Sequence, residues 1–546
     1  MGDLSVVYEP PPGARNRANS VREFYKDATI LLTGGTGFIG KALLEKLLRC
    51  FEVKSVFLLI REKRNKTADE RLEEVFEDVV FDAIKATPNG GKPLLAKVVP
   101  IEVNFQSDVV ISSADYQRLL AAHVEIVFNV MASVKFNEDI ETAIDTNVLS
   151  SRKLFLLAQQ LPHIRSIVHV STFYSNCHRS HIEERIYEDL PFGGFENILG
   201  LFRHLSPEEK ARLKPIILGP MPNSYTFSKR CAEVMVQQQF AQLPIAIFRP
   251  PIVTSAYREP MPGWVNNFNG PAGMVVPVIR GQIYWCYGIA DATVHMVPVD
   301  YCVNALLAVA WDNCQRKQIT KPATDEAVPV YNYAFRENVF QNRDIGALLA
   351  LGINSTLGRI FGRYTIHVTS STFMRKLFIH WLLLQACVVD IYNKLIGKKA
   401  KNFETIKRVV ALEDSTSYFR CHSWTTENAN IRTLWDRLPM EEQQLLPFDV
   451  ETLDWKDYFR FFVPGVAAAL SRQSLARQRM HRFRYHVFHD FLWPYEVTEV
   501  DLCFGIAYLF DDHTYGIRWW EIGQLTTQVG RTAQGDIVRG FQPKNV

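Results

Sequence analysis

The stretch Ala28–Cys50, ATILLTGGTGFIGKALLEKLLRC, decides the fold. Its first six residues are mostly apolar and β-prone, glycines follow at positions 34, 37 and 40, and leucines then recur at helical spacing. This order predicts a strand, a glycine-rich turn and a helix. A turn without Cβ atoms lets backbone amides approach a pyrophosphate, and a helix N-terminus presents unpaired N–H groups to it. In this context the pattern favours dinucleotide binding over a bare turn without a ligand.

Length and composition bound the class of protein. The chain has 546 residues, of which 47% are hydrophobic, and this suffices for two or more domains with a sizeable core. A net charge of +3 is close to balance and does not indicate nucleic-acid binding. Nine cysteines are scattered without a CxxC pair. That spacing argues against a disulfide framework or a zinc site and predicts reduced thiols in a cytosol-facing protein.

The first residues are predicted to form a mobile arm, residues 1–27. They contain no apolar core long enough for a signal peptide. Val6 also stands where an N-myristoylation signal needs serine or threonine. The folded chain is therefore expected to begin near Ala28.

Between Ala28 and about Ala310, apolar β-rich runs alternate with helical patterns. The alternation predicts a doubly wound parallel sheet of the Rossmann type, with helices on both faces. Its second strand, expected at Val56–Ile60, ends in Arg61-Glu62-Lys63-Arg64. In such folds this strand end contacts the adenosine ribose, with an acid for a free 2′-hydroxyl or an arginine for a 2′-phosphate. The basic residues favour NADPH over NADH. Two alternatives stay open, a solvated basic loop and a hydroxyl contact through Glu62.

Hydroxyl groups follow a later strand of the same predicted sheet. Further strands are expected at residues 95–102, 124–128 and 165–171, with a long helix over 137–160. The last strand ends in Ser171 and Thr172. Ligands of doubly wound sheets lie beyond the carboxyl ends of the strands, so these hydroxyls are predicted to lie at the functional edge.

A tyrosine and a lysine four residues apart complete the candidate site. Asn223 or Ser224 can cap a helix, on which Tyr225 and Lys229 then share one face. An ammonium near a phenol favours the phenolate, which makes the tyrosine a better proton donor or acceptor near neutral pH. Such a pair on its own is typical of a surface contact. After a glycine-rich turn and a Ser-Thr strand end, it indicates catalysis.

With these motifs in order, the chain resembles an extended short-chain dehydrogenase/reductase, and more narrowly the alcohol-forming fatty acyl-CoA reductases, the eukaryotic family that also contains male-sterility proteins. The resemblance covers most of residues 28–470. It is carried by TGGTGFIG at 33–40, LLIREKRNK at 58–66 with Glu70-Arg71-Leu72 behind it, VSTFYSNC at 170–177, NSYTFSK at 223–229, FRPPIV at 248–253, VPVDYCVNA at 297–305, YFRCHSWTTENANIRTLWDRL from Tyr418 and FDVETLDWKDYFRFFVPG from Phe448.

The resemblance implies roles for individual residues. Thr172, with Ser171 as its less favoured neighbour, would hydrogen-bond the reacting carbonyl. Tyr225 would donate the proton, and Lys229 would hold the nicotinamide ribose while lowering the pKa of the phenol. The glycines would hold the pyrophosphate and Arg61 the 2′-phosphate. The implied cofactor-binding set is Thr33, Gly34, Gly37, Phe38, Ile39, Gly40, Arg61, Asn104, Tyr225 and Lys229. No metal is implied.

The implied activity is NADPH-dependent reduction of a long-chain fatty acyl-CoA, through an aldehyde, to the primary alcohol with release of CoA. Hydroxyl donors suit this reaction because hydride attack on a thioester creates an oxyanion. Cys177 lies near the Ser-Thr pair, but no activating histidine pattern accompanies it, and His178 is expected to point away in a strand. The resemblance suggests a membrane surface as a partner and the cytosolic face of the peroxisome or endoplasmic reticulum as the location.

Three positions depart from the family pattern. Val103-Asn104 replaces the usual Gly-Asp pair after the third strand, which leaves the adenine contact open. Residues 129–132 replace His-x-Ala-Ala, and Pro250-Pro251-Ile252 replaces Pro-Ser-Ile. These departures keep a catalytically silent nucleotide-binding scaffold open as an alternative. Another extended dehydrogenase, acting on a sterol or nucleotide-sugar, is disfavoured by the C-terminal match.

Two segments lie outside these motifs. Glu183–Met221 is an irregular insertion, interpreted either as a surface loop or as a lid over an acyl chain. Leu377–Val389 is apolar except for His380 and Gln385 and is shorter than the roughly 20 residues that span a bilayer, so a buried or interfacial helix is expected. Basic residues on either side of it suit anionic headgroups.

The expected organisation has five parts. They are the arm at 1–27, an NADP-binding Rossmann reductase domain with substrate-binding insertions at 28–345, a connecting segment with an apolar, membrane-associated helix at 346–400, a helical fatty acyl-CoA reductase C-terminal domain at 401–470, and a basic segment and tail without an assigned role at 471–546.

Overall fold

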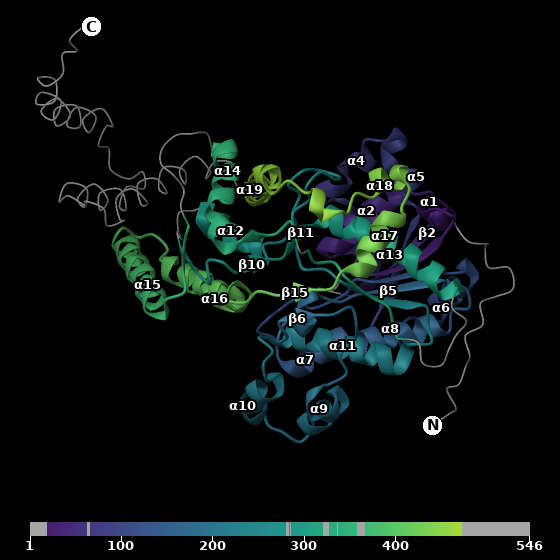
Figure 1. Ribbon diagram of the computed structural model, residues 1–546, viewed down its shortest axis with the longest axis horizontal. Helices are drawn as coiled ribbons and strands as arrows, with labels where there is room; N and C mark the ends of the chain where they lie inside the picture. Colours follow the sequence, from purple (N-terminus) through teal and green to yellow (C-terminus); the bar gives the residue numbers. More distant parts are fainter. Residues whose placement is uncertain are drawn as a thin grey trace, which may run out of the picture.

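The computed structural model describes residues 19–62, 66–279, 283, 285–319, 327–335, 337–357 and 366–471. Within these ranges, seven parallel strands form one sheet in the order β12-β7-β5-β4-β1-β2-β3 (Figure 1). The strands are β1 (Thr29–Thr33), β2 (Ser55–Arg61), β3 (Val98–Val103), β4 (Ile126–Asn129), β5 (Ser166–Val170), β7 (Ile245–Arg249) and β12 (Val330–Asn332). The predicted doubly wound parallel sheet is confirmed.

Neighbouring residues of β1 enter different hydrophobic cores. Ile30 and Leu32 pack with α2 (Phe38–Cys50) and α13 (Val299–Ile319). Leu31 packs in a second cluster with residues of α8 (Ser150–Gln159) and α11 (Ser224–Phe240). Successive side chains of a strand point to opposite faces, so an apolar strand needs helices on both. Figure 1 shows α2 and α13 on one side of the sheet and α8 and α11 on the other.

The remaining described elements complete both layers and the C-terminal part. The other helices are α1 (Val21–Tyr25), α3 (Ala68–Phe76), α4 (Asp82–Lys85), α5 (Lys92–Leu95), α6 (Ser113–Ala122), α7 (Ile140–Ile144), α9 (Phe195–Phe202), α10 (Pro207–Leu218), α12 (Pro271–Ile279), α14 (Ile345–Leu357), α15 (Thr372–Leu395), α16 (Asn402–Arg420), α17 (Ala429–Arg437), α18 (Met440–Leu445) and α19 (Trp455–Ser471). Short strands pair as β6 (His181–Ile182) with β15 (Thr425–Thr426), β8 (Ile252–Thr254) with β11 (Met296–Pro298), β9 (Trp285–Tyr287) with β14 (His367–Thr369), and β10 (Thr293–Val294) with β13 (Phe340–Gln341).

The helix expected over 137–160 is interrupted. A π-helical turn over Asp145–Leu149 separates α7 from α8. On this turn, Asn147 accepts a 2.8 Å hydrogen bond from the Ser133 amide and donates to the Ser228 hydroxyl at 2.9 Å. π-bulges often occur at functional sites, and this one ties the loop after β4 to the helix that carries the tyrosine and lysine. Hydrophobic spacing alone gives no sign of one extra residue in a turn.

The expected N-terminal arm ends earlier than predicted. Residues 21–25 form α1, in which Val21, Phe24 and Tyr25 are fully buried. The Tyr25 hydroxyl donates to the Leu307 carbonyl of α13 at 2.9 Å. The i, i+3, i+4 spacing of these apolar residues lets one short helix bury all three, so this end of the segment is part of the fold.

The C-terminal helices share the core of the sheet. Tyr458, Phe459 and Phe462 of α19 belong to the same hydrophobic cluster as β1 and α2. A Cβ on Gly465 would lie 1.9 Å from the Gly263 carbonyl oxygen, so α19 presses directly on the loop before α12. These helices therefore complete the reductase core.

Two segments left open by the sequence are helical. The insertion at 183–221 contains α9 and α10, and Ser206 and Glu209 form a capping box at the start of α10. The apolar run at 377–389 lies within the longer helix α15. By length and composition, α15 is the one described helix able to cross a membrane, and 11% of its apolar window is buried.

Candidate active site

A cavity of about 1180 Å³ opens at the carboxyl ends of β1 and β4. The strand order reverses between these two strands, and ligands of open α/β sheets bind at such a point. Most of the residues expected in the site line this one cavity, namely Gly34, Gly37, Phe38, Ile39, Gly40, Arg61, Asn104, Ser171, Thr172, Tyr225 and Lys229.

The glycine turn is closed tightly against β4 and α2. Gly34 has a φ of +73°, and a Cβ there would lie 2.8 Å from the Met131 amide nitrogen. A Cβ on Gly40 would lie 2.2 Å from the Gly34 carbonyl oxygen. Gly37 precedes α2 and provides no side-chain cap, and Gly37, Phe38 and Ile39 line the cavity, so no capping side chain occupies the start of the helix there. The turn therefore fits the cradle that a pyrophosphate needs.

Thr33 lies outside the cavity lining. Its hydroxyl donates to the Asn129 side-chain oxygen at 2.8 Å and accepts from the Met131 amide at 3.3 Å. Asn129 also donates to the Ser151 hydroxyl at 3.0 Å. The residues that replace the usual His-x-Ala-Ala pattern thus anchor the turn to β4, and Met131 itself lines the cavity.

Two arginines meet at the ribose end of the cavity. Arg61 ends β2, and Arg71 of α3 donates to the Arg61 carbonyl oxygen. Arg71 also lies 3.5 Å from the Thr36 hydroxyl of the glycine turn. Burial and the neighbouring Arg61 charge lower the pKa of Arg71. Two guanidinium groups therefore lie on the cavity lining beside the glycine turn. At the adjacent edge, the Asn104 side-chain oxygen accepts from the Gln106 amide at 2.9 Å.

Thr172 and Tyr225 meet across the cavity. Thr172 follows β5 and begins a 3₁₀ turn over Phe173–Asn176. Burial raises the pKa of Tyr225 to about 12, although a hydrogen bond with the Thr172 side chain opposes this rise. The expectation of a lowered phenol pKa is therefore wrong for this structure. Desolvation outweighs the hydrogen bond, and at neutral pH the phenol keeps its proton.

Lys229 lies one helical turn from the tyrosine and is 1% exposed. Its ammonium donates to the Val170 carbonyl oxygen at 2.7 Å. Burial lowers the lysine pKa to about 8, and the Glu233 carboxylate opposes the shift. The predicted pairing of Tyr225 and Lys229 on one face of α11 thus places both on the cavity wall.

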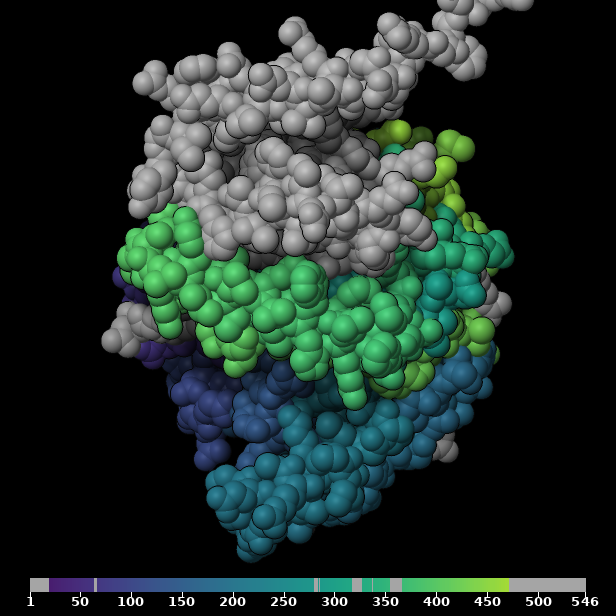
Figure 2. Space-filling model, turned by 90° about the vertical axis from the view of Figure 1, so that its left-hand side faces the viewer, coloured from purple at the N-terminus to yellow at the C-terminus, as the bar shows by residue number. Residues whose placement is uncertain are grey.

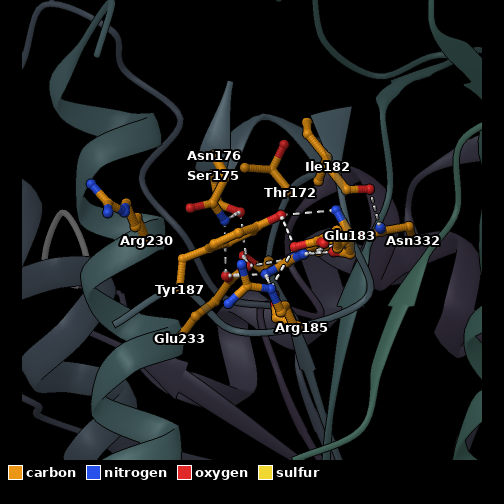
Figure 3. Close-up of polar contacts among 12 residues, drawn as sticks. Thr172, Ser175, Asn176, Ile182, Glu183, Arg185, Tyr187, Arg230, Glu233 and Asn332 are labelled. Atoms are coloured by element: carbon orange, nitrogen blue, oxygen red, sulfur yellow. Dashed lines mark hydrogen bonds and ion pairs between the residues drawn. The ribbon is translucent and has the colours of Figure 1, made fainter. Parts of the chain in front are cut away.

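Ser171 is occupied by another partner. Its hydroxyl donates to the Glu233 carboxylate, which also accepts from the Ser175 hydroxyl at 2.9 Å. Glu233 in turn forms a fully buried ion pair with Arg249, with an Nη2–Oε2 distance of 2.7 Å. Figure 3 shows the polar contacts around Glu233. This leaves Thr172 as the strand-end hydroxyl available for a substrate carbonyl.

The same network reaches the start of the insertion. Arg249 donates to the carbonyl oxygens of Glu183 at 3.1 Å and Arg185 at 2.9 Å. It also donates to the Asn332 side chain at 3.2 Å, and Asn332 donates to the Ile182 carbonyl oxygen (Figure 3). The ion pair therefore links the end of β5 to the first residues of the insertion.

Cys177 is a poor nucleophile in this setting. Burial raises the pKa of its thiol to about 12, and burial lowers the pKa of His178 to about 4. The segment before it is a 3₁₀ turn, so the expectation that His178 lies in a strand is wrong. Neither group is therefore activated for nucleophilic attack at neutral pH.

Several residues in or near the cavity were not predicted from the sequence. Arg71 and Glu233 were visible only as part of the family motif or not at all, because their partners lie elsewhere in the chain. Phe419 of α16 and Phe462 of α19 also line the cavity, although no residue beyond Lys229 was expected there. Their membership of the motifs from Tyr418 and Phe448 was the available signal.

Known protein families and relatives are similar to this chain in sequence. An NAD-binding profile described as male sterility protein matches residues 32–306, and a second profile with the same description matches residues 381–473. The chain is 35% identical to fatty acyl-CoA reductase wat of Drosophila melanogaster, over 81% of this chain and 84% of that relative. It is 31% identical to fatty acyl-CoA reductase 1 of Homo sapiens, over 85% and 90%.

Solved structures share the fold. The terminal R domain of the myxalamid PKS-NRPS pathway superposes with a TM-score of 0.51 at 18% identity, over 82% of this chain and 92% of that domain. The reductase domain of a nonribosomal peptide synthetase from Mycobacterium tuberculosis gives 0.50 at 15% identity, over 86% and 95%.

Proposed function

The chain belongs to the male sterility protein family of fatty acyl-CoA reductases, oxidoreductases with a nicotinamide cofactor, and from this premise we propose that it reduces a long-chain fatty acyl-CoA to the primary fatty alcohol with NADPH. CoA leaves after the first reduction, and an aldehyde is the intermediate. The observation that carries the proposal is that Thr172, Tyr225 and Lys229 line the same cavity as the glycine turn.

The residues present fit a dinucleotide. The turn from Gly34 to Gly40 leaves no room for Cβ atoms, and the start of α2 offers its amides to a pyrophosphate. Lys229, on the cavity wall, would hold the nicotinamide ribose. The cofactor supplies the hydride. Within the cavity, α11 and the end of β5 orient the reacting carbonyl beside it.

Arg61 and Arg71 support NADPH as the coenzyme. A 2′-phosphate carries about two negative charges, and a guanidinium binds phosphate through paired N–H groups. Glu62 also lines the cavity and would repel that phosphate, or accept from a 2′-hydroxyl in its place. Glu102 of β3, which pairs with Ile60 of β2, lines the cavity as well. Because Arg71 also contacts the glycine turn through Thr36, we favour NADPH.

In each reduction, Tyr225 supplies one proton to the carbonyl oxygen and Thr172 stabilises the charge on it. As the thioester carbon gains hydride, the Thr172 hydroxyl steadies the developing oxyanion and Tyr225 gives it a proton. On collapse, that proton returns to the tyrosine oxygen, the C–S bond breaks, and the CoA thiolate takes a proton from solvent. The aldehyde carbonyl then occupies the same position and receives a hydride that a second NADPH would supply. Tyr225 gives its proton to form the alcohol and regains one from solvent.

The acyl chain is assigned to the C-terminal side of the cavity. Phe419, Phe459 and Phe462 line this side together with Met274 and Val278 of α12. We therefore propose that residues 28–345 bind the cofactor and that the helices of 401–470 complete the acyl pocket. The boundary is one of function, because both parts share one core.

The test is a product assay with purified protein, acyl-CoA and each reduced coenzyme. We expect two NADPH consumed per alcohol, with NADPH used more efficiently than NADH. Release of aldehyde alone, or consumption of one NADPH per product, would contradict the proposed sequence of steps.

The coenzyme assignment has its own test. Arg71→Ala removes one guanidinium from the ribose end, so KM for NADPH should rise about ten-fold while KM for NADH stays the same, the scale expected for one charged hydrogen bond. Arg118→Ala, at an exposed ion pair on α6, is the matched control. Equal effects of Arg71→Ala on both coenzymes would remove the arginine from this role.

We also propose a location on the cytosolic face of the peroxisome or endoplasmic reticulum membrane, because a long-chain acyl-CoA partitions to lipid surfaces. The exposed apolar helix α15 supports attachment to such a surface.

A further inference from the structure

The middle of the outward side of α15 is apolar, and its exposed polar and charged residues lie toward the two ends. Its exposed large hydrophobic residues recur every three or four positions along one face: Phe373, Leu377, Trp381, Leu384, Val388, Ile391 and Leu395. Between Trp381 and Ile391 the one other exposed residue is Cys387, so no charge interrupts the stripe there. At a rise of about 1.5 Å per residue the stripe is about 33 Å long. We call these seven residues the α15 stripe.

Two charged groups of the helix, Asp390 and Arg375, are turned away from the stripe. Asp390, the one acid in α15, accepts from the Asn402 and Phe403 amides at 2.9 Å and so caps α16. These contacts lower the pKa of Asp390, although burial opposes the shift. Arg375 pairs with Glu413 of α16 at 3.2 Å. Both side chains therefore face the protein, and the stripe is left to the outside.

The opposite side of α15 is fixed to the reductase. Phe378 stacks on Trp285 of β9 with ring centroids 5.3 Å apart, and Leu382 and Ala386 are buried with Ile406 of α16. Trp285 also lines the cavity. Figure 2 shows α15 and α16 as a band across one face of the molecule, in green. One strand thus separates the back of α15 from the acyl pocket.

These contacts are incompatible with a helix that crosses a bilayer alone. Spanning would carry α16 into the hydrocarbon, and α16 exposes Glu404, Lys407 and Arg408. Charged side chains are costly at the bilayer centre. A helix that lies in the interface needs to bury one face only.

Exposed cations stand at both ends of the stripe. Lys376 lies at its start, and Lys394, Lys399 and Lys401 lie at its end. Basic residues next to an apolar helix face are attracted to anionic headgroups. The charge pattern therefore selects an anionic lipid surface over an apolar protein partner.

We propose that α15 lies flat in the interface of an anionic membrane, with the α15 stripe among the acyl chains and the lysines at the headgroups. This orientation holds β9 and the adjoining cavity directly over the lipid surface. Acyl-CoA that is dissolved in the membrane then meets the pocket without crossing water, a consequence that rests on the proposed reductase function.

The test uses the full chain with vesicles of phosphatidylcholine, alone or mixed with phosphatidylserine, that contain a photoreactive lipid. Crosslinked peptides are identified by mass spectrometry, so binding through any other part of the chain is distinguished from binding through α15. We expect crosslinks at the α15 stripe, more of them on the anionic vesicles, and about ten-fold fewer in Leu384→Glu/Val388→Glu.

The control is Val109→Glu/Met440→Glu, which adds the same two charges at exposed apolar residues away from α15. Both double variants should keep wild-type turnover of a water-soluble short-chain acyl-CoA, which shows that fold and chemistry are intact. Loss of that turnover in Leu384→Glu/Val388→Glu alone would make the stripe part of the fold and overturn the proposal. Vesicle binding without α15 crosslinks, or crosslinks that extend to Leu382 and Ala386 as in a spanning helix, would also overturn it.

Discussion

Replacing Lys229 with methionine tests the electrostatics of the site. The proposed reaction needs the Lys229 ammonium, but burial of this charge destabilises the folded protein. Burial lowers the pKa of Lys229 from 10.5 to about 8. One pKa unit corresponds to about 1.4 kcal/mol, so the buried ammonium costs the folded state roughly 3 kcal/mol at neutral pH. Methionine removes this cost and also the hydrogen bond to Val170, worth about 1 kcal/mol. Lys229→Met should therefore be more stable by about 2 kcal/mol while turnover falls about 100-fold or more.

The sign of this effect depends on pH. Below about pH 8 the lysine is charged in both folded and unfolded chains, and the full cost applies. Between about pH 8 and pH 10.5 the folded chain has lost the proton that the unfolded chain still holds, so the cost disappears. The stability gain of Lys229→Met should thus shrink as pH rises through this window. Above it, the lost hydrogen bond should leave the variant slightly less stable.

The assay is urea unfolding of wild type and variant at about pH 7 and about pH 9.5, where linkage predicts that the gain falls by roughly 2 kcal/mol. Lys214→Met is the control, because the half-buried Lys214 also donates to a carbonyl, that of Glu138 at 2.8 Å, but lies outside the cavity. It should lose a little stability at both pH values. A variant at position 229 that is less stable than wild type at neutral pH, or a gain independent of pH, would refute the account of a strained buried charge.

Two further variants test the supports of the site. Glu233→Gln leaves Arg249 buried without its counter-charge, so the free energy of unfolding should fall by about 3–5 kcal/mol in urea titration, and an unchanged value would show that the ion pair carries no net stability. Gly40→Ala drives a Cβ against the Gly34 carbonyl oxygen and should weaken NADPH binding about ten-fold in fluorescence titration. Gly200→Ala, where a Cβ meets nothing within 4 Å, should bind normally; equal affinities for both variants would contradict the tight cradle.

Local patterns in the sequence predicted the frame of the site. The glycine turn, the strand end at Thr172 and the spacing of Tyr225 and Lys229 are each contained in a few consecutive residues. The parallel sheet then brings strand ends together at one edge, because every strand of such a sheet runs the same way. That geometry needs no knowledge of distant contacts.

What the sequence missed depends on distant contacts. Arg71 reaches the ribose end because α3 folds back on β2, and Glu233 matters because Arg249 arrives from another strand. The direction of the Tyr225 pKa shift was predicted wrongly because burial raises this pKa, and a sequence does not display burial. In α15, likewise, the apolar run was visible, but which of its faces stays exposed is decided by α16 and β9.

The central claim is that the Tyr225 phenol gives the proton to the reduced carbonyl. Tyr225→Phe removes one oxygen from a protonated phenol that lines the cavity and leaves the ring in place. Steady-state turnover of acyl-CoA should fall about 100-fold or more, the scale for a positioned acid, while the affinity for NADPH measured by fluorescence stays at the wild-type value. Wild-type turnover in this variant would show that another group supplies the proton.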